Sequence, residues 1–552
     1  MLPAPTGESA PSHDWNLGRA RIAVALLLGL TQGLGINMVN ANLPQIQGEL
    51  GATLAEINWL TTAYYASNLS AVVLLAKVRF QFGLRLFADL SILLFLVVSV
   101  MDLFTHNLGV AIAIRALLGV AAAPLSTLAV LYMLQAFPQR LAVVGALLGF
   151  AVLQLGGPLS RLLSEDVLHV GLWQGMHLLE LALALMSVGA LHRVKLNSEP
   201  PQQMFSLGDI ASFGFYAAAL ALLCVVLTQG RTYWWTDAPW LGVCLATSIV
   251  CFGIYILVEL HRKSPMLDLH WLGSLFMLRF IVAVFLFRIA LSETSVGAVG
   301  LLTSLGLNND QMHGLFIWVT AGTLAGFLIS LVILAATKNL RLPGRFGLVL
   351  IIIAALLDSR STLLSRPDNF YLSQTLLALA GSMFLSSALL VGITNVIEGG
   401  RKNMVSFIAV FNGAQVLGSL LGGALLSTFF ADRVALHYNH LVESITLADP
   451  QVVKRLAQLA ASVGQNLPDG VQRSAQGLSI LAQQVRREAL MLAYNDVFEL
   501  VAVVAMITLA WRGAHAMRMT RVDAWQRNAA ESSSTQARSS QSAHSDRTTA
   551  TA

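Results

Sequence analysis

Fourteen apolar segments, each long enough to cross a lipid bilayer as a helix, follow one another along the chain. A spanning helix needs about 20 mainly apolar residues, and lipid leaves the backbone polar groups no partners outside the segment itself. The pattern therefore predicts an all-α integral membrane protein. The segments lie near residues 20–43, 56–78, 86–104, 108–134, 140–164, 168–191, 207–229, 239–260, 274–303, 311–337, 345–364, 370–394, 403–430 and 493–515.

Positive charges in the short loops predict the orientation of these segments. Cytoplasmic loops are enriched in Lys and Arg, and an N-terminus in the cytoplasm puts most of them inside. The inside set is then Arg19, Arg21, Lys77, Arg79, Arg85, Arg140, Arg193, Lys195, Arg262, Lys263, Lys338, Arg341, Arg345, Arg401, Lys402, Arg512, Arg518 and Arg521. The short outside loops hold only Arg231, Arg360 and Arg366. We therefore expect an even number of helices with both termini cytoplasmic.

The amino-acid composition is that of a protein surrounded by lipid, and it excludes several classes of function. Hydrophobic residues make up 56% of the chain and charged residues only 11%, against about 25% charged in soluble domains. The formal net charge of +5 belongs to the inside loops, so no nucleic-acid partner is expected. Three cysteines lie in apolar segments without metal-ligand spacing. Because a nucleophile–base set and a nucleotide-binding loop are also missing, we expect no enzyme activity, no cofactor and no metal site.

The connection at residues 431–492 is much longer than the others and lies outside in this orientation. It contains two amphipathic helical stretches, 449–464 and 474–490, separated by a turn at 466–470. It is either a solvated cap over the last two helices or a docking surface for a partner. The Ser/Thr-rich tail at 516–552 is typical of disorder.

Several short stretches occur in an order that is familiar from one family. They are NANLPQI at 40–46, NWLTTAY at 58–64, AKVRFQFGLRLF at 76–87, RALLG at 115–119, GGPLSRL at 156–162, GSLLGGALLSTF at 418–429 and REALMLAYNDVF at 487–498. In this order and in these helices the stretches resemble the major facilitator superfamily, and within it the fourteen-helix drug:proton antiporters of the EmrB/QacA type. The likeness extends from residue 20 to residue 515.

The resemblance implies a fold, a function and partners. The fold would be an N-terminal tail at 1–19, a six-helix bundle at 20–191, two additional helices at 207–260, a second six-helix bundle at 274–515 and a cytoplasmic tail. The function would be export of amphipathic small molecules or drugs through the inner membrane by alternating access, driven by protons. The implied partners are substrate, protons, the lipid bilayer, a periplasmic adaptor of the membrane-fusion type at 431–492, and an outer-membrane channel.

The chain also departs from the family pattern at polar positions. The acid of the loop after the second helix falls on Phe80, and an acid common in the first helix falls on Gly35. The glutamine of the fourth helix is replaced by Leu118. These losses keep open an alternative function, a transporter-derived protein without proton coupling that serves as a facilitator, sensor or scaffold.

Ionisable side chains inside spans are costly and usually face a cavity or the bundle interior, so each is a candidate site. Arg115 matches the arginine that the family is thought to use in proton coupling. Glu180 and Glu293 are the two candidate proton carriers, because burial favours the protonated form of a carboxyl group. Arg288 completes the candidate coupling set, but it lies about 140° around the helix from Glu293 and does not form an ideal pair with it. His177 is expected to make a structural hydrogen bond.

Three further groups of residues follow from the motifs. The candidate gating motif is Lys77, Arg79, Gly83 and Arg85. The candidate helix-packing motif of the fifth helix is Gly149, Gly156, Gly157, Pro158 and Arg161, in which small residues permit close helix contact and the proline permits a kink. The candidate substrate cavity is Asn37, Asn40, Trp59, Tyr64, Gln154 and Asn412.

Arg161 is the least expected residue of the fifth helix, because it replaces a glycine of the family motif. It lies about one turn before the polar end of its segment, so its side chain can reach the outer interface. It either anchors the helix at that interface or alters a gate or substrate contact, with Glu165 and Glu180 as candidate partners.

Overall fold

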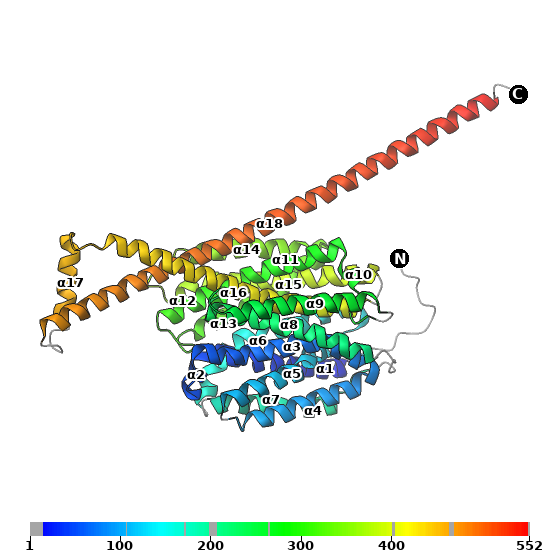
Figure 1. Cartoon of the computed structure of the whole chain (residues 1–552). Coiled ribbons are helices and arrows are strands. Elements are labelled where there is room, and N and C mark those ends of the chain that lie inside the picture. The colour runs from blue at the N-terminus through cyan, green and yellow to red at the C-terminus, as the bar shows by residue number, and fades with distance from the viewer. Residues whose placement is uncertain are drawn as a thin grey trace.

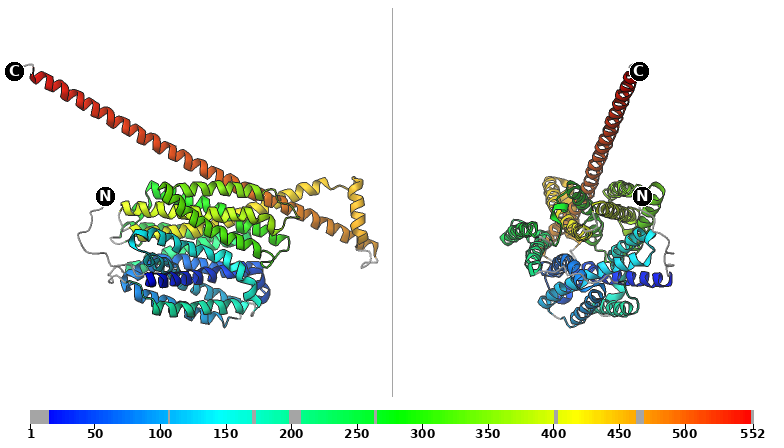
Figure 2. Two further views of the ribbon diagram at one scale, coloured as in Figure 1. Left: turned by 180° about the vertical axis from the view of Figure 1, so that it is seen from behind. Right: turned by 90° about the vertical axis from the view of Figure 1, so that its right-hand side faces the viewer.

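The structure is a computed structural model that describes residues 15–105, 107–169, 173–197, 207–262, 265–399, 403–462 and 469–549. The described chain is almost entirely helical, and its long helices run side by side (Figures 1 and 2). Arg401, Lys402 and Lys263, which were used to predict the orientation, lie outside the described residues.

The first half of the chain forms one bundle. Its helices are α1 (Trp15–Ala41), the short α2 (Leu43–Leu50), α3 (Leu54–Phe82), α4 (Leu84–Asp102), α5 (Leu108–Ala136), a 3₁₀ turn η1 (Gln139–Leu141), α6 (Ala142–His169) and α7 (Trp173–Arg193). Helix α5 packs on α1, α3, α4 and α6 and is the centre of this bundle. Two further helices, α8 (Leu207–Tyr233) and α9 (Pro239–Leu260), pack on each other, and α8 also packs on α3.

The second half forms a bundle around α15. Its elements are α10 (Leu269–Leu272), α11 (Leu275–Leu291), a π-helical turn η2 (Thr294–Ala298), α12 (Val299–Ser304), α13 (His313–Thr337), α14 (Leu342–Asp358), a 3₁₀ turn η3 (Pro367–Phe370), α15 (Tyr371–Gly399), α16 (Met404–Ser444), α17 (Pro450–Ser462) and α18 (Gly470–Thr549). Helix α15 packs on α13 and α14, and α18 packs on α14 and α16.

Each of the fourteen predicted segments coincides with a helical stretch of the described chain. Twelve helices there are long and apolar enough to cross a membrane. The two predicted segments without such a helix form α3 and α14, and α14 has only 17 residues. The fold is therefore the all-α, multi-pass architecture that the sequence predicts.

Apolar side chains cover the outside of the helices as well as the core. Val243 and Ile249 on α9 are 65% and 64% exposed, and Leu328 and Val332 on α13 are 59% and 67% exposed. A water-soluble surface does not carry contiguous apolar faces of this extent. These faces are the ones that lipid covers.

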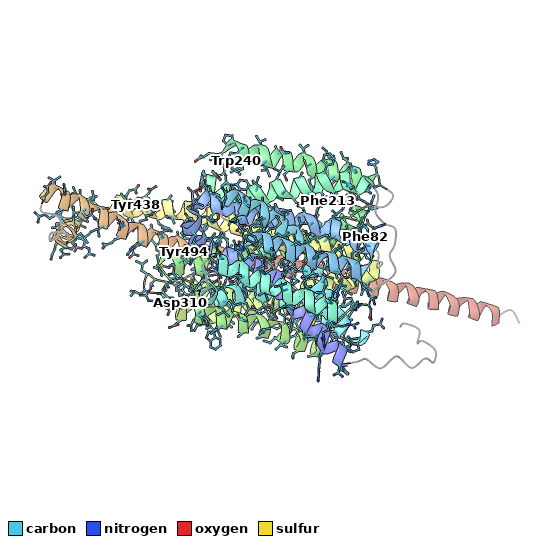
Figure 3. The ribbon with its side chains drawn as sticks, turned by 90° about the horizontal axis from the view of Figure 1, so that it is seen from below. Phe82, Phe213, Trp240, Asp310, Tyr438 and Tyr494 are labelled. Atoms are coloured by element: carbon cyan, nitrogen blue, oxygen red, sulfur yellow. The ribbon has the colours of Figure 1, made fainter. Side chains whose placement is uncertain are left out.

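The two ends of the helices differ. Figure 3 shows Phe82 and Phe213 at one end, Trp240 and Asp310 at the opposite end, and Tyr438 beyond that end. Helix α1 begins on the Phe82 side, and the terminal part of α18 also extends on that side (Figure 3). This arrangement is consistent with both termini on one face of the membrane.

On the opposite face, the long connection is a helical protrusion rather than a loop. Helix α16 continues to Ser444 and α18 begins at Gly470, so both extend out of the bundle and α17 crosses between their ends (Figure 1). Helix α16 has 41 residues, about 60 Å at 1.5 Å per residue, twice the bilayer core. Arg433 and His437 both contact Asp496 at the base, at 2.5 and 2.6 Å.

The side chains that follow Ala514 lie outside the described residues. The disorder expected for the tail at 516–552 stays a prediction.

Two glycine positions determine how the first bundle is assembled. Gly83 has φ 79° and ψ 157°, a conformation that favours glycine, and it separates α3 from α4. Gly156 of α6 lies against Gly33 of α1 so closely that a Cβ atom on Gly156 would be 2.6 Å from the Gly33 Cα atom. Helices α1 and α6 therefore touch backbone to backbone.

Candidate functional site

The first bundle holds a buried ion pair between two of the predicted residues. Arg115 of α5 is 1% exposed, and its Nη1 atom lies 3.9 Å from Oε2 of Glu180 on α7. Its Nη2 atom donates a hydrogen bond of 2.9 Å to the carbonyl oxygen of Gly35. The guanidinium also lies over the Tyr64 ring, 5.2 Å from its centroid. Tyr64, predicted for the substrate cavity, is thus a wall of this ion-pair site.

A second acid–base pair adjoins the first. His177 Nδ1 lies 2.8 Å from Oδ2 of Asp102, at the end of α4. One ligand atom from each of Asp102, His177 and Glu180 lies within 4.8 Å of the others. The three side chains could surround a cation, but Arg115 already supplies positive charge beside Glu180. We name these four residues, Arg115, Glu180, His177 and Asp102, the N cluster.

Gly35 explains how Glu180 fits. A Cβ atom at position 35 would lie 3.1 Å from Glu180 Oε1 and 3.7 Å from its carboxyl carbon. The carboxylate of α7 therefore occupies the space toward which a side chain at position 35 of α1 would point. The acid that the family pattern has in the first helix is absent here, and a carboxylate from another helix lies at that place.

A cavity of about 420 Å³ lies between the two bundles. Its walls include Asn37 of α1, Gln154 of α6 and Asn412 of α16 from the predicted cavity set, together with Arg288 of α11. Arg288 donates from Nε to the Gln415 carbonyl oxygen at 3.2 Å. Among the described residues that line this cavity, Arg288 is the only one with a formal charge. The cavity can thus offer amides and one positive charge to a ligand.

The other predicted cavity residues lie elsewhere. Asn40 donates to the Tyr65 hydroxyl at 3.3 Å and accepts a hydrogen bond of 2.7 Å from Thr61. Trp59 stacks on Trp240 of α9, with ring centroids 6.4 Å apart. Neither belongs to the cavity lining. Their polar and aromatic groups join α1, α3 and α9 to one another instead.

The second bundle holds two buried acids without a cation. Glu293, at the end of α11, is 0% exposed, and Asp358, at the end of α14, is 3% exposed. Gln374 Nε2 of α15 donates to both Glu293 oxygens, at 3.2 and 3.1 Å, and to Asp358 Oδ2 at 2.8 Å. Neither acid takes part in an ion pair within the described chain. We name Glu293, Asp358 and Gln374 the C cluster.

Two candidate residues that are close in the sequence, Arg288 and Glu293, lie in different sites. Arg288 and Glu293 lie five residues apart, yet the first lines the cavity and the second faces Gln374. Like charges without a cation disfavour double ionisation in a buried site. Within the described chain, Glu293 and Asp358 are held together through the amide of Gln374.

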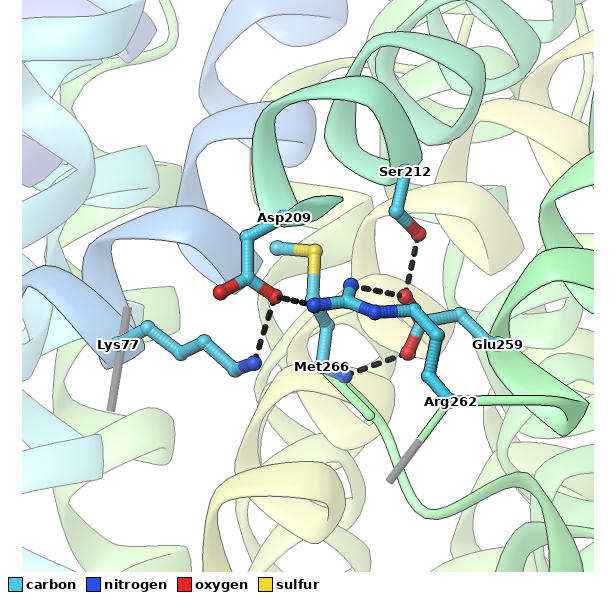
Figure 4. A network of polar contacts seen from close by, with 6 residues as sticks. All are labelled: Lys77, Asp209, Ser212, Glu259, Arg262 and Met266. Carbon is cyan, nitrogen blue, oxygen red and sulfur yellow. Dashed lines mark hydrogen bonds and ion pairs between the residues drawn. The ribbon is translucent and has the colours of Figure 1, made fainter. Parts of the chain in front are cut away.

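The predicted gating motif belongs to an ion network with the additional helices. Lys77 Nζ of α3 lies 2.7 Å from Oδ1 of Asp209 on α8, and Arg262 Nη2 lies 2.6 Å from the same oxygen (Figure 4). Arg262 Nη1 also lies 2.9 Å from Oε1 of Glu259 on α9. Ser212 donates to the same Glu259 oxygen. The network joins α3 to α8 and α9.

The other gating residues have different contacts. The Arg79 guanidinium lies over the ring of Phe80, 4.6 Å from its centroid, where the family has an acid. Arg85 Nε donates to the Leu196 carbonyl oxygen at 3.4 Å. The acid that is missing at Phe80 thus has no substitute on this loop, but Asp209 of α8 gives Lys77 a counter-charge.

Arg161 links the two bundles. Its Nη1 atom donates a hydrogen bond of 2.8 Å to Asn309 Oδ1, and Asn309 Nδ2 donates to the Ala41 carbonyl oxygen at 2.8 Å. The guanidinium also lies over the Phe316 ring, 5.3 Å from its centroid. Glu180, one expected partner, pairs with Arg115 instead, and the side chain of Glu165 lies outside the described residues. The contact favours the gate interpretation.

The remaining residues of the helix-packing motif either allow close contact between helices or border the cavity. A Cβ atom on Gly149 would lie 3.0 Å from the Val130 Cα atom of α5. Gly157 faces the cavity, and its nearest neighbour would be Asn37 Oδ1 at 3.9 Å. Pro158 lies inside α6.

Sequence reasoning missed Asp102, Asp358, Gln374, Asp209 and Glu259. The acids stand at the ends of apolar segments, where a charge is expected to reach the interface. Their burial depends on neighbours far away in the chain. A usable signal was the pairing of His177 with Glu180 one turn apart, which marks a polar face on α7 and calls for a partner from another helix.

Comparisons with known proteins come from sequence and from structure. No family model matches the chain. The multidrug export protein EmrB of Haemophilus influenzae is 23% identical over 524 residues, which cover 92% of this chain and 98% of that relative. The fatty acid resistance protein FarB of Neisseria gonorrhoeae is 22% identical over 511 residues, covering 90% and 96%.

Solved structures share the fold. The human organic anion transporter MFSD10 superimposes with a TM-score of 0.53 at 11% identity, covering 90% of this chain and 100% of that one. A bacterial homologue of the human drug peptide transporters gives a TM-score of 0.52 at 14% identity, covering 91% and 99%. The chain is thus similar to EmrB-type multidrug exporters along nearly their whole length, and it shares the fold of solved transporters.

Proposed function

We propose that this protein exports amphipathic small molecules through the inner membrane by alternating access, in exchange for protons, and that it prefers anionic substrates. The observation on which this rests is the cavity between the bundles, with amides, apolar walls and the single charge of Arg288. Cavities at the interface of two such bundles are the usual binding sites of secondary transporters. A buried guanidinium favours a ligand that brings a negative charge.

The N cluster supplies a place for proton exchange. Glu180 is buried and adjoins Arg115, whose charge is permanent. The guanidinium favours the ionised carboxylate, and burial favours the protonated one. A movement that separates Arg115 from Glu180 would therefore load a proton, and their return would release it. The relatives named as multidrug exporters support the export part of the proposal.

Proteoliposomes test the coupling. Vesicles that contain wild-type protein and an amphipathic anionic dye receive an imposed pH gradient, and dye flux is measured. We expect gradient-dependent flux in wild type and a loss of at least tenfold in Glu180→Gln. Glu443→Gln, an exposed acid on α16, is the matched control and should behave as wild type. Flux in wild type that ignores the gradient would rule out antiport.

The anionic preference has a separate test. Wild type and Arg288→Gln are compared with a carboxylate dye and with its neutral methyl ester. We expect Arg288→Gln to reduce transport of the carboxylate about tenfold or more and that of the ester far less, since only the former uses the charge. Equal losses for both dyes would remove the preference while leaving export intact.

The protrusion is the proposed contact for a periplasmic adaptor of the membrane-fusion type, which would lead to an outer-membrane channel. Large apolar side chains are exposed on it, including Leu447 at 74%, Val453 at 46% and Leu478 at 57%. Co-purification with an adaptor encoded beside this protein is the measurement. Val453→Asp with Leu478→Asp should abolish it and Glu443→Gln should not. Retained binding in the double variant would contradict this contact.

A second candidate function is a transporter-derived facilitator, sensor or scaffold without proton coupling. The absence of acids at Gly35 and Phe80 favours it. Its signature in the same vesicles is flux that follows the dye gradient alone, or no flux.

A further inference from the structure

A second cavity, of about 280 Å³, lies inside the C-terminal bundle and away from the central one. Helices α11, α14, α15 and α18 enclose it, at the end of the bundle where α11 and α14 begin and α15 ends. The loop charges predict that this end faces the cytoplasm. The cavity belongs neither to the proposed substrate path nor to the N cluster.

Four arginines line this cavity: Arg279, Arg341, Arg345 and Arg512. Its lining, as far as the chain is described, includes no aspartate or glutamate. None of the ion pairs of the described residues involves Arg341, Arg345 or Arg512. The neighbouring guanidinium groups of Arg341, Arg345 and Arg512 repel one another, and no carboxylate of the described lining lies among them. Such an arrangement favours the binding of an anion.

One of these charges lies against an aromatic side chain of the lining. The guanidinium of Arg512 lies over the ring of Phe384, 5.4 Å from its centroid. Most of the other lining residues are apolar, including Phe276, Phe280 and Val391. The site thus combines a polycationic head region with a hydrophobic groove.

This chemistry matches a phosphate group that is attached to an acyl chain. Arginine binds phosphate oxygens with two parallel N–H donors, and basic pockets between spanning helices on the cytoplasmic side recognise anionic lipid headgroups. A soluble phosphate would satisfy the arginines but would leave the apolar wall uncovered. We propose that this pocket binds an anionic phospholipid of the inner leaflet, with its phosphate among the arginines and an acyl chain along the wall of Phe276 and Phe280.

The bound lipid would tie together the four helices that surround it. Because α11 and α15 also extend to the central cavity, occupancy of the pocket would stabilise one packing of this bundle. The proposal does not depend on export, since binding and stability report on it directly.

The test uses the purified full-length protein in neutral detergent, with native mass spectrometry and thermal unfolding as readouts. The variant is Arg345→Gln with Arg512→Gln. The matched control is Arg19→Gln with Arg193→Gln, which removes two exposed charges on the same face. The probes are phosphatidylglycerol, phosphatidylcholine with the same chains, and inorganic phosphate.

We expect phosphatidylglycerol to bind wild type and the control, and to raise their unfolding temperature. Two charges at about 1 kcal/mol each correspond to a loss of affinity on the order of thirtyfold in the pocket variant. Phosphatidylcholine should bind weakly to all three proteins. Ala283→Leu, which narrows the apolar wall and keeps the arginines, should weaken the lipid and spare inorganic phosphate.

Two outcomes would overturn the proposal. If phosphatidylglycerol binds the pocket variant as tightly as the control, the four arginines do not form the site. If inorganic phosphate alone reproduces the full stabilisation and Ala283→Leu has no effect on the lipid, the pocket serves a soluble anion and not a membrane lipid. Dye transport measured on the same preparations shows separately whether the export function holds.

Discussion

The two bundles bury acids in opposite ways. In the N cluster each carboxylate has a positive or protonatable partner, with Arg115 beside Glu180 and His177 beside Asp102. In the C cluster Glu293 and Asp358 share only the amide of Gln374. The first arrangement balances its acids with basic side chains, whereas the second surrounds them with neutral hydrogen-bond donors. One fold thus contains a charged core and a hydrogen-bonded core, and their responses to substitution should differ.

The largest difference should appear when each cluster loses one acid. Glu180→Gln leaves the buried charge of Arg115 without its partner, which costs about 3–5 kcal/mol. Glu293→Gln removes no cation's partner and should cost less than about 1 kcal/mol. Chemical denaturation in detergent measures both. Equal costs would mean that the N cluster is not held by charge.

The next difference concerns the groups that organise each cluster. Gln374→Leu removes the donor that both acids of the C cluster share among the described residues. It should destabilise the protein by about 2–3 kcal/mol, because buried acceptors are left unsatisfied. Gln374→Glu should destabilise the protein more than Gln374→Leu, since it adds a third carboxyl group to the buried cluster. Thermal unfolding ranks the two variants. If Gln374→Leu leaves the unfolding temperature unchanged, water supplies the hydrogen bonds that these acids lose.

A smaller effect should come from Gly35. Gly35→Ala brings a methyl group to 3.1 Å from Glu180 Oε1 and should cost about 1 kcal/mol, as the carboxylate moves. Gly157→Ala is the control, because its nearest contact would be 3.9 Å away. The pH dependence of transport should change in the first variant only. If both variants transport alike, the fit at Gly35 does not matter to function.

The smallest effect on stability should come from Arg161. Arg161→Gln can still donate a hydrogen bond toward Asn309, so unfolding should change by less than about 1 kcal/mol. The contact joins the two bundles on one side only, so transport rate should respond more than stability. Crosslinking between positions 161 and 309 measures how long this side stays closed. A large loss of stability would show that Arg161 serves the core and not a gate.

The sequence predicts the helices well and the clusters only in part. Apolar length decides where a chain crosses lipid, so each segment could be found locally. Arg115 and Glu180 were recognisable because a charge inside a span is expensive. Asp102 and Asp358 were not, because a charge at the end of a segment has a solvated alternative, and only packing with α7 or α15 removes it.

The cavity and the network show the same limit. Asn37, Gln154 and Asn412 come together only when both bundles meet, and the partner of Lys77 is 132 residues away. The protrusion was visible as two amphipathic stretches, but not as a continuation of α16 and α18. Helical continuity across polar residues depends on where the helix begins, which local composition does not encode.

The contact between Gly33 and Gly156 has a mechanical consequence. Two helices that meet through interlocked side chains can change angle only if rotamers change, whereas α1 and α6 meet through bare backbone. Around such a contact, α6 can change its angle to α1 without a change of side-chain rotamers at the point of contact. A single methyl group at either glycine would lie 2.6–3.0 Å from the facing Cα atom and would push the two helices apart. We therefore expect such a variant to exchange between its two sides more slowly.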